Sequence, residues 1–301
     1  MKNIINEIKK NKIGDYLENV SMSKYTTYRV GGEASLIVYP SDETKLIKLI
    51  HILRDNDIKY KVLGNGSNVV FSDKNYDGVI IKLDSLNQLI IDDTIIRVGS
   101  GYNLIKLAYK LSKMGLSGIE FATGIPGTVG GAVYMNAGAY KSDMGYIVSS
   151  IKVVTPDLRI KDIYNKDLAF HYRDSFLQKN KGYICIEATF VLKHGNIKEI
   201  ADLIEDRKQK RLLTQPLEFP SAGSVFRNPT NDFAGRLVEE VGLKGYSIGG
   251  ALVSPKHANF IVNYNKATAD DIRNLIFHVK DEVKKQHGID LLVEQEFVNW
   301  E

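Results

Sequence analysis

The sequence predicts an α+β fold with more than one domain. The chain has 301 residues, which is long for one hydrophobic core, although single domains of this length occur. Helical and strand-like apolar patterns alternate in the first part, and β-rich runs dominate the middle. From about Asn196 the pattern changes to a long charged helix, so we place a domain boundary after residue 195.

A helix followed by a short strand is predicted after Pro40. Ser41 is a candidate N-cap, and the run 60–63 is typical of a strand. Apolar residues between them recur at the spacing of one helical face, at Leu46, Leu49, Ile50 and Leu53.

The middle of the chain is predicted to be mostly sheet around one further helix. β-rich runs occur at 69–71, 79–81, 147–156 and 183–193. Gly115 can end the helix in a left-handed conformation. The apolar face of that helix is formed by Leu104, Leu107, Ala108 and Leu111.

The last third is predicted to be a compact α+β region. Its first helix has apolar residues from Ile197 to Ile204 and must end before Pro216. A helix over 234–241 is closed by Gly242, and a capping-box pattern at 268–271 opens a helix that ends before Gly288.

Composition excludes several functional classes. The 40 Lys and Arg and 36 Asp and Glu are spread along the chain, which argues against nucleic acid and permits an anionic small substrate. The single cysteine, Cys185, lies in an apolar strand-like run, so no disulfide framework is expected. With six scattered histidines, no metal site is predicted. A signal-peptide core and a bilayer-spanning run are missing, so a cytoplasmic location without membrane insertion is expected.

The loop Gly64-Asn65-Gly66-Ser67-Asn68 is a candidate cradle for a pyrophosphate. It follows the strand at 60–63, and glycines let backbone N–H groups approach a phosphate. Val69 at the third glycine position argues against a Rossmann fingerprint, and the loop lacks a Walker lysine. A hairpin turn is the alternative interpretation.

A denser glycine cluster occupies residues 124–140. So many glycines lose much backbone freedom on folding, which a flat cofactor lying against bare backbone would offset. Close packing of two main-chain segments explains the same pattern equally well.

Seven ordered segments carry a family resemblance across nearly the whole chain. They are Tyr28–Gly32, Gly64–Asn68, Gly118–Tyr140, Tyr172–Ser175, Gln215–Glu218, Ser221–Pro229 and Lys256–Asn263. With these motifs the chain resembles the UDP-N-acetylenolpyruvoylglucosamine reductases, in the shorter subtype of many Gram-positive bacteria.

The resemblance implies a vanillyl-alcohol-oxidase or PCMH-type FAD-binding fold. It implies two FAD-binding subdomains at 1–83 and 84–195, with the FAD region at about 26–193. A C-terminal α+β substrate-binding domain at 196–301 would follow, and its last residues would return to the active site.

The resemblance also implies FAD as cofactor and NADPH as hydride donor. Arg211 matches a basic position associated with phosphate contact, and a solvated charge is the alternative. The implied cofactor-binding residues are Gly64, Asn65, Gly66, Ser67, Asn68, Thr123, Gly124, Ile125, Pro126, Gly127, Gly130, Gly131, Ala137, Gly138 and Arg211.

Three catalytic residues follow from the same resemblance. Arg173 and Glu294 would flank an enolate-like charge, and Ser224 would deliver a proton. The alternatives are a surface ion pair between Arg173 and Asp174, and a turn-forming role for Ser224. The family usually has a basic residue where Glu296 stands, so the electrostatics beside Glu294 differ here.

The implied substrate is UDP-N-acetylenolpyruvoylglucosamine, reduced in cell-wall synthesis. No nucleic-acid partner and no obligate protein partner are expected. Two rival functions remain, another FAD oxidase of the same fold and a non-catalytic flavin or nucleotide-sugar binding protein. The candidate substrate-binding residues are Tyr172, Arg227, Asn228, His257 and Asn259.

Overall fold

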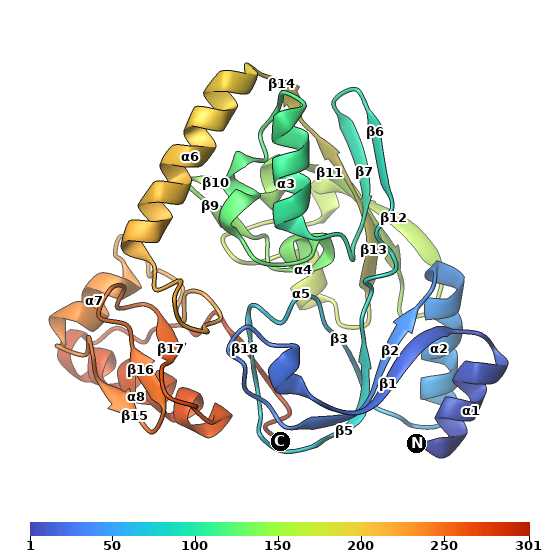
Figure 1. The fold of residues 1–301 in the computed structure, drawn as a ribbon, viewed down its shortest axis with the longest axis horizontal. Coiled ribbons are helices and arrows are strands. Elements are labelled where there is room, and N and C mark those ends of the chain that lie inside the picture. The colour runs from blue at the N-terminus through green and yellow to red at the C-terminus, as the bar shows by residue number, and fades with distance from the viewer. The chain divides into compact units, whose positions relative to one another are not determined.

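A computed structural model describes residues 1–301 (Figure 1). The chain folds into two compact units. The first unit comprises residues 1–18, 35–65 and 77–208, and the second comprises 19–34, 66–76 and 209–301. The second unit therefore combines the C-terminal third of the chain with two short segments from the N-terminal part.

A four-stranded sheet in the order β1-β2-β5-β3 forms one part of the fold, with β3 parallel to β5. Helix α2 begins after Asp42, whose carboxylate accepts a hydrogen bond from Lys45 N at 2.8 Å. The predicted cap at Ser41 is therefore wrong by one residue, because Asp42 directly precedes the first helical residue and lies three residues before Lys45, where an N-cap side chain accepts. The elements are α1 (Lys2–Lys10), β1 (Gly14–Ser21), β2 (Glu33–Pro40), α2 (Glu43–Asp55), β3 (Tyr60–Val62) and β5 (Tyr76–Ile81).

A five-stranded antiparallel sheet in the order β12-β11-β13-β7-β6 forms the rest of the first unit. Gly115 ends α3 with φ +76°, as predicted. Cys185 is buried in β13, and burial raises the pKa of its thiol to about 12. The helices are α3 (Leu104–Lys113), α4 (Val129–Tyr134) and α5 (Phe176–Lys179), and the strands are β6 (Leu89–Asp92), β7 (Ile95–Gly99), β8 (Leu116–Ser117), β9 (Gly138–Ala139), β10 (Ser142–Asp143), β11 (Val148–Val154), β12 (Ile160–Tyr164), β13 (Ile184–Val191) and β14 (Lys193–His194).

A three-stranded sheet covered by α8 forms the centre of the second unit. The capping box of α8 is confirmed, since Thr268 and Asp271 each accept from the other's backbone N–H at 3.0 Å. Gly288 ends this helix with φ +71°. The elements are β4 (Val69–Phe71), α7 (Ala234–Glu240), β15 (Ser247–Ile248), β16 (Ala251–Val253), β17 (Ile261–Asn263), α8 (Ala269–His287) and β18 (Glu296–Val298).

Helix α6 (Ile197–Thr214) begins directly after the predicted boundary and ends before Pro216. The division into two compact units falls inside this helix, between residues 208 and 209. The functional division into 1–83, 84–195 and 196–301 stays a prediction.

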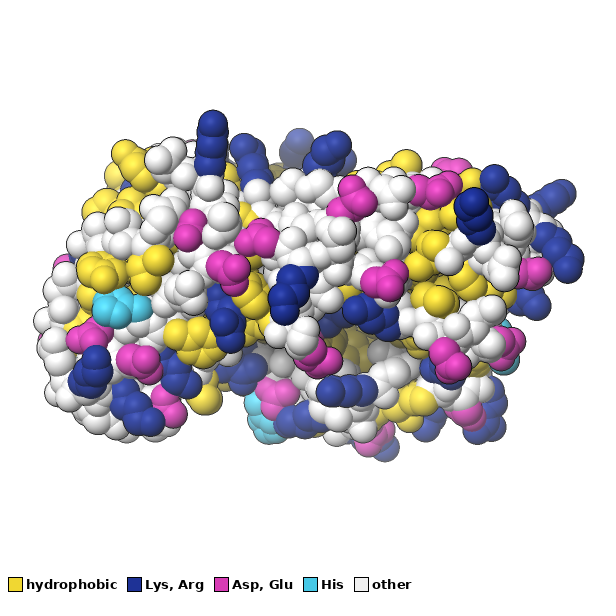
Figure 2. Space-filling model, turned by 90° about the horizontal axis from the view of Figure 1, so that it is seen from below, with side chains coloured by type: hydrophobic (Ala, Val, Ile, Leu, Met, Phe, Trp, Pro, Cys, Tyr) yellow, Lys and Arg dark blue, Asp and Glu magenta, His cyan; other side chains and the backbone are white.

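Charges of both signs are intermixed on the face of the molecule shown in Figure 2. None of the helices is both long enough and apolar enough to span a bilayer. The structure contains no group of three or more His, Cys, Asp or Glu side chains that could hold a metal ion.

Candidate active site

Gly64, the first residue of the loop 64–68, lies beside the second glycine segment within the first unit. Leu63 alone separates Gly64 from the end of β3. A Cβ on Gly64 would lie 2.8 Å from Thr128 Oγ1 and 3.9 Å from Gly131 Cα. Thr128 Oγ1 caps α4 by accepting a hydrogen bond from Gly131 N at 3.3 Å. Gly64 is therefore closely packed against Thr128, whereas Gly131 has room for a Cβ and presents main chain without a side chain, which suits close approach of a flat ligand.

The loop Gly64–Asn68 is not a hairpin turn. Strand β3 before it pairs in parallel with β5, whereas β4 after it pairs in parallel with β18. A hairpin requires two antiparallel strands paired with each other, so the hairpin interpretation is wrong.

Close packing within the chain explains some of the glycines. Gly66 has φ +63°, and a Cβ there would lie 2.0 Å from the carbonyl oxygen of Tyr25. A Cβ on Gly130 would lie 2.8 Å from Ser100 Cβ, and one on Gly138 would lie 2.5 Å from Asp143 Cβ. The close-packing interpretation therefore holds at Gly64, Gly66, Gly130 and Gly138, while Gly131 has only an ordinary contact with Thr128.

Lys82 is a residue at this site that the sequence reasoning missed. Its Nζ donates a hydrogen bond to the carbonyl oxygen of Gly64 and lies 3.4 Å from Asp84 Oδ1. The side chain is buried, and burial lowers the pKa of Lys82. A buried cation is therefore fixed to the first residue of the candidate pyrophosphate loop. The available signal was a lysine at the end of the apolar run 79–83.

Arg173 lies in a tight turn beside the second glycine segment. His171 and Asp174 exchange two backbone hydrogen bonds of 3.0 Å, which leaves Arg173 with φ +56°. Such a conformation is costly for a residue with a side chain and often occurs at functional sites. Arg173 Nη2 donates to the carbonyl oxygen of Gly138 at 2.7 Å, whereas Asp174 pairs with Lys179 at 2.6 Å. The guanidinium is therefore held at the glycine segment.

Tyr172 precedes Arg173 in the same turn and is 53% exposed. Its ring centroid lies 5.3 Å from Cζ of Arg173, within the range of a cation–π contact. The exposed ring leaves Tyr172 accessible to a ligand, and its substrate contact stays a prediction.

Ser224 and Glu294 are close neighbours in the backbone of the second unit. Between them, Glu294 N donates to the carbonyl oxygen of Val225 at 2.8 Å. Asn68 Nδ2 donates to the carbonyl oxygen of Glu294 at 3.1 Å. Asn68, proposed from sequence as a cofactor residue, thus helps to hold the segment that carries a candidate catalytic carboxyl group.

Asn259 also supports this backbone. It is buried, and its side-chain amide bonds to both N and O of Phe226, at 2.9 Å and 2.8 Å. Its carbonyl oxygen accepts from Val225 N at 2.9 Å. These bonds fix the two residues that follow Ser224, so Asn259 has a positioning role and its direct substrate contact stays a prediction.

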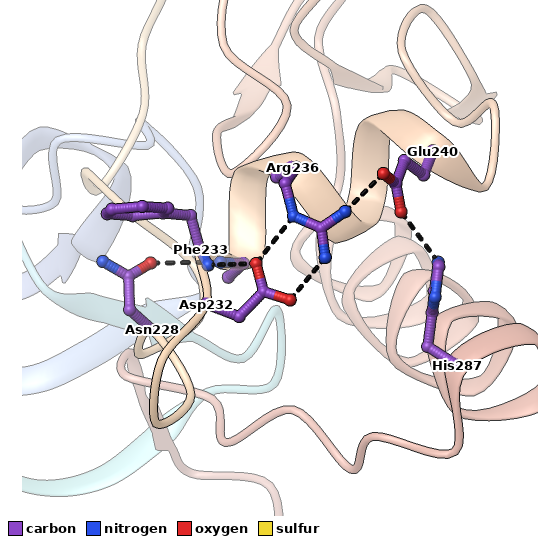
Figure 3. Close-up of polar contacts among 7 residues, drawn as sticks. Asn228, Asp232, Phe233, Arg236, Glu240 and His287 are labelled. Carbon is purple, nitrogen blue, oxygen red and sulfur yellow. Dashed lines mark hydrogen bonds and ion pairs between the residues drawn. The ribbon is translucent and has the colours of Figure 1, made fainter.

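A charged network holds the turn after Asn228 (Figure 3). Asn228 Oδ1 accepts from Ala234 N at 3.1 Å, while Asp232 accepts from Arg236 Nε at 2.7 Å. Arg236 also pairs with Glu240. The Arg236 guanidinium lowers the pKa of Asp232 to about 2, so this carboxylate stays ionised at neutral pH.

Three further residues predicted to bind a ligand have hydrogen-bond partners within the chain. His257 Nδ1 accepts from Asn259 N at 3.2 Å, and burial lowers the pKa of His257. Arg211 Nε donates to Gln215 Oε1 at 2.6 Å, and Arg227 N donates to the carbonyl oxygen of Leu292 at 2.9 Å. Ligand contacts of these residues stay predictions.

Comparison with known proteins identifies both parts of the chain. Residues 34–163 match the family model of an FAD binding domain, and residues 215–298 match that of the UDP-N-acetylenolpyruvoylglucosamine reductase C-terminal domain. These matches confirm the predicted α+β fold with an FAD-binding region.

Full-length relatives agree with these two matches. The UDP-N-acetylenolpyruvoylglucosamine reductases of Anoxybacillus flavithermus and Bacillus subtilis are 46% and 42% identical over 299 residues, covering 99% of this chain and 99% of each relative. The crystal structure of the reductase from Thermus caldophilus has a TM-score of 0.81 and 33% identity, covering 93% of this chain and 98% of that one. The chain therefore belongs to the UDP-N-acetylenolpyruvoylglucosamine reductase family.

Proposed function

We propose that this chain reduces UDP-N-acetylenolpyruvoylglucosamine to UDP-N-acetylmuramate with NADPH and FAD. The observation that carries this proposal is the 46% identity to a named reductase across 99% of both chains. The product would serve peptidoglycan precursor synthesis in the cytoplasm, and through it cell-wall formation, cell shape and division.

The glycine segments of the first unit fit a bound flavin. Gly131 presents main chain without a side chain, and the buried cation of Lys82 lies at Gly64, the first residue of the loop. Bound FAD would supply the hydride, taken from NADPH, to the enolpyruvyl group. Residues 64–68 would hold the pyrophosphate and residues 123–140 would flank the cofactor. Neither segment contains His or Cys, so we expect the flavin to be noncovalent.

The catalytic roles follow from the charge that the reaction creates. Hydride addition to the terminal carbon of the enolpyruvyl group leaves an enolate-like charge, and protonation of the neighbouring carbon completes the reduction. Arg173 supplies a permanent cation for that charge, and Glu294 supplies a hydrogen-bonding carboxyl group. The hydroxyl of Ser224 delivers the proton.

The proposed substrate-binding residues lie in two turns that are exposed or half-buried. Tyr172 directly precedes Arg173, and Arg227 and Asn228 follow Ser224. Tyr172 and Arg227 carry groups suited to the sugar nucleotide and its carboxylate. Asn228 presents its amide from the turn that the Arg236 network fixes. His257 and Asn259 shape the same region of the second unit.

The decisive experiment measures flavin and turnover together. The purified protein should show flavin absorbance, and acid precipitation should release the flavin from the protein. Beyond the single equivalent that reduces the bound flavin, NADPH should be consumed only when UDP-N-acetylenolpyruvoylglucosamine is present. Oxygen consumption with an alcohol substrate would favour the oxidase alternative, and bound flavin without turnover would favour the binding-protein alternative.

Lys82→Met is expected to weaken FAD binding by about 10-fold or more. The substitution keeps most of the apolar stem but leaves the carbonyl of Gly64 without its charged donor, and hydrogen bonds to charged groups contribute about 1.5–3 kcal/mol. Fluorescence titration of the flavin-free protein with FAD measures the dissociation constant directly. Lys152→Met is the control, because Lys152 is paired with Glu187 on the sheet. Equal FAD affinities for both variants would remove Lys82 from the cofactor site.

A further inference from the structure

A buried glutamine joins three segments of the second unit. Gln295 Nε2 lies 3.2 Å from the carbonyl oxygen of Ala222, 3.3 Å from that of Gly223 and 3.4 Å from that of Ser224. Its Oε1 accepts a hydrogen bond from the hydroxyl of Tyr28 at 3.1 Å. Gln295 is 3% exposed and Tyr28 is fully buried.

Three consecutive carbonyl groups converge on one amide because the chain turns at Gly223. This glycine has φ +74°, a conformation that other residues rarely adopt. Buried carbonyl groups without a hydrogen-bond donor are unfavourable. The two N–H groups of the Gln295 amide are therefore the donors that make this loop conformation favourable.

Tyr28 fixes the direction in which the Gln295 amide points. A tyrosine hydroxyl can donate to the amide oxygen, and this bond leaves the NH₂ group facing the three carbonyl oxygens. Burial raises the pKa of Tyr28, so its hydroxyl keeps the proton that it donates. The reverse orientation of the amide would place oxygen against oxygen at Ala222, Gly223 and Ser224.

The same segment also holds the loop through its backbone. Glu294 precedes Gln295 and bonds through its N–H to the carbonyl oxygen of Val225. The Gln295 side chain thus bonds to the carbonyl groups of residues 222–224, and the Glu294 main chain bonds to that of Val225. The direction of the Ser224 side chain is set by this backbone.

We propose that Gln295 is a positioning residue for the Ser224 loop, with Tyr28 orienting its amide. This inference rests on the proposed function, because the loop carries the group proposed to donate the proton. Loss of the amide should let the Ser224 hydroxyl leave the position from which it reaches the substrate carbon. Reduction of the flavin by NADPH needs no proton from Ser224 and should be unaffected.

The test compares two half-reactions of the FAD-loaded enzyme by anaerobic stopped flow. Gln295→Met keeps the length and approximate volume of the side chain and removes its donor and acceptor. We expect reoxidation by UDP-N-acetylenolpyruvoylglucosamine to slow by about 10-fold or more, with flavin content and NADPH reduction unchanged. The solvent deuterium isotope effect on reoxidation should increase, because proton delivery becomes slower.

Two further variants separate positioning from stability. Tyr28→Phe keeps the Gln295 amide and loses only the hydroxyl that orients it, so reoxidation should slow by a smaller factor of about 3. Ile276→Val removes one methylene group from the buried face of α8 and should lower the melting temperature while leaving both half-reactions at the parent rate.

The outcomes distinguish the inference from the function on which it rests. A parent enzyme that its substrate cannot reoxidise overturns the proposed function itself. If the parent is reoxidised and Gln295→Met matches its rate and isotope effect, Gln295 has only a structural role and the inference is wrong. If Gln295→Met does not fold, Tyr28→Phe decides, and a parent rate in that variant also overturns the inference.

Discussion

Ser224→Ala should still allow NADPH to reduce the flavin, but its reoxidation by UDP-N-acetylenolpyruvoylglucosamine should slow by about 100-fold or more. A positioned acid typically contributes this factor or a larger one. The first half-reaction requires no proton at the sugar substituent, whereas the second does. The backbone around Ser224 is held by Gln295 and Asn259, so removing one hydroxyl group should leave the loop in place.

Anaerobic stopped-flow absorbance of the flavin measures both steps in one preparation. Ser221→Ala is the matched control, because it removes a half-buried hydroxyl three residues earlier in the same segment. Its two rates should equal those of the parent. Reoxidation of Ser224→Ala at the parent rate would assign Ser224 to structure and place the proton donor elsewhere.

Local signals in the sequence predicted most of the helices. The capping box at Thr268 and the glycine at 288 place both ends of α8 correctly, because the interactions that end a helix involve only neighbouring residues. Gly115 likewise places the C-terminal end of α3 correctly. The cap of α2 was predicted at Ser41 but is Asp42, because these two adjacent residues both have side chains suited to an N-cap.

The supporting contacts of the site could not be predicted in this way. Asn68 bonds to Glu294 across 226 residues of sequence, and Tyr28 bonds to Gln295 across 267. Periodicity and capping describe neighbours along the chain and carry no information about such pairs. Lys82 was missed for the same reason, since a lysine after a strand resembles a surface charge until its partner is known.

The glycine motifs show a different limit of sequence reasoning. Gly66 and Gly130 avoid collisions with other parts of the chain, whereas Gly131 has room for a Cβ. All three have the same appearance in the sequence. Only the atoms around each glycine separate packing from a surface available to a ligand.

Glu294→Gln is expected to slow flavin reoxidation by the substrate by about 100-fold, the usual effect of losing a group that stabilises developing charge. The change keeps the size of the side chain but replaces the carboxyl group that would donate a hydrogen bond to the enolate by a weakly acidic amide that cannot transfer a proton. The backbone of Glu294 bonds to Val225 and Asn68, and these bonds do not depend on the carboxyl group. Flavin content and NADPH reduction should therefore stay at parent levels.

Glu296→Gln is the matched control, because it makes the same chemical change two residues later. Glu296 begins β18, and its N–H donates to the carbonyl oxygen of Asn68 at 2.9 Å, so both acids are anchored through the same asparagine. The family resemblance implies a basic residue at this position, so a carboxylate is not expected to be required there. We expect its reoxidation rate to stay within about 3-fold of the parent, as for a charge that takes no part in the reaction. A large loss in Glu296→Gln with a parent rate in Glu294→Gln would transfer the catalytic carboxyl role to Glu296, and the spacing from Gly288 that selects Glu294 would then be misleading.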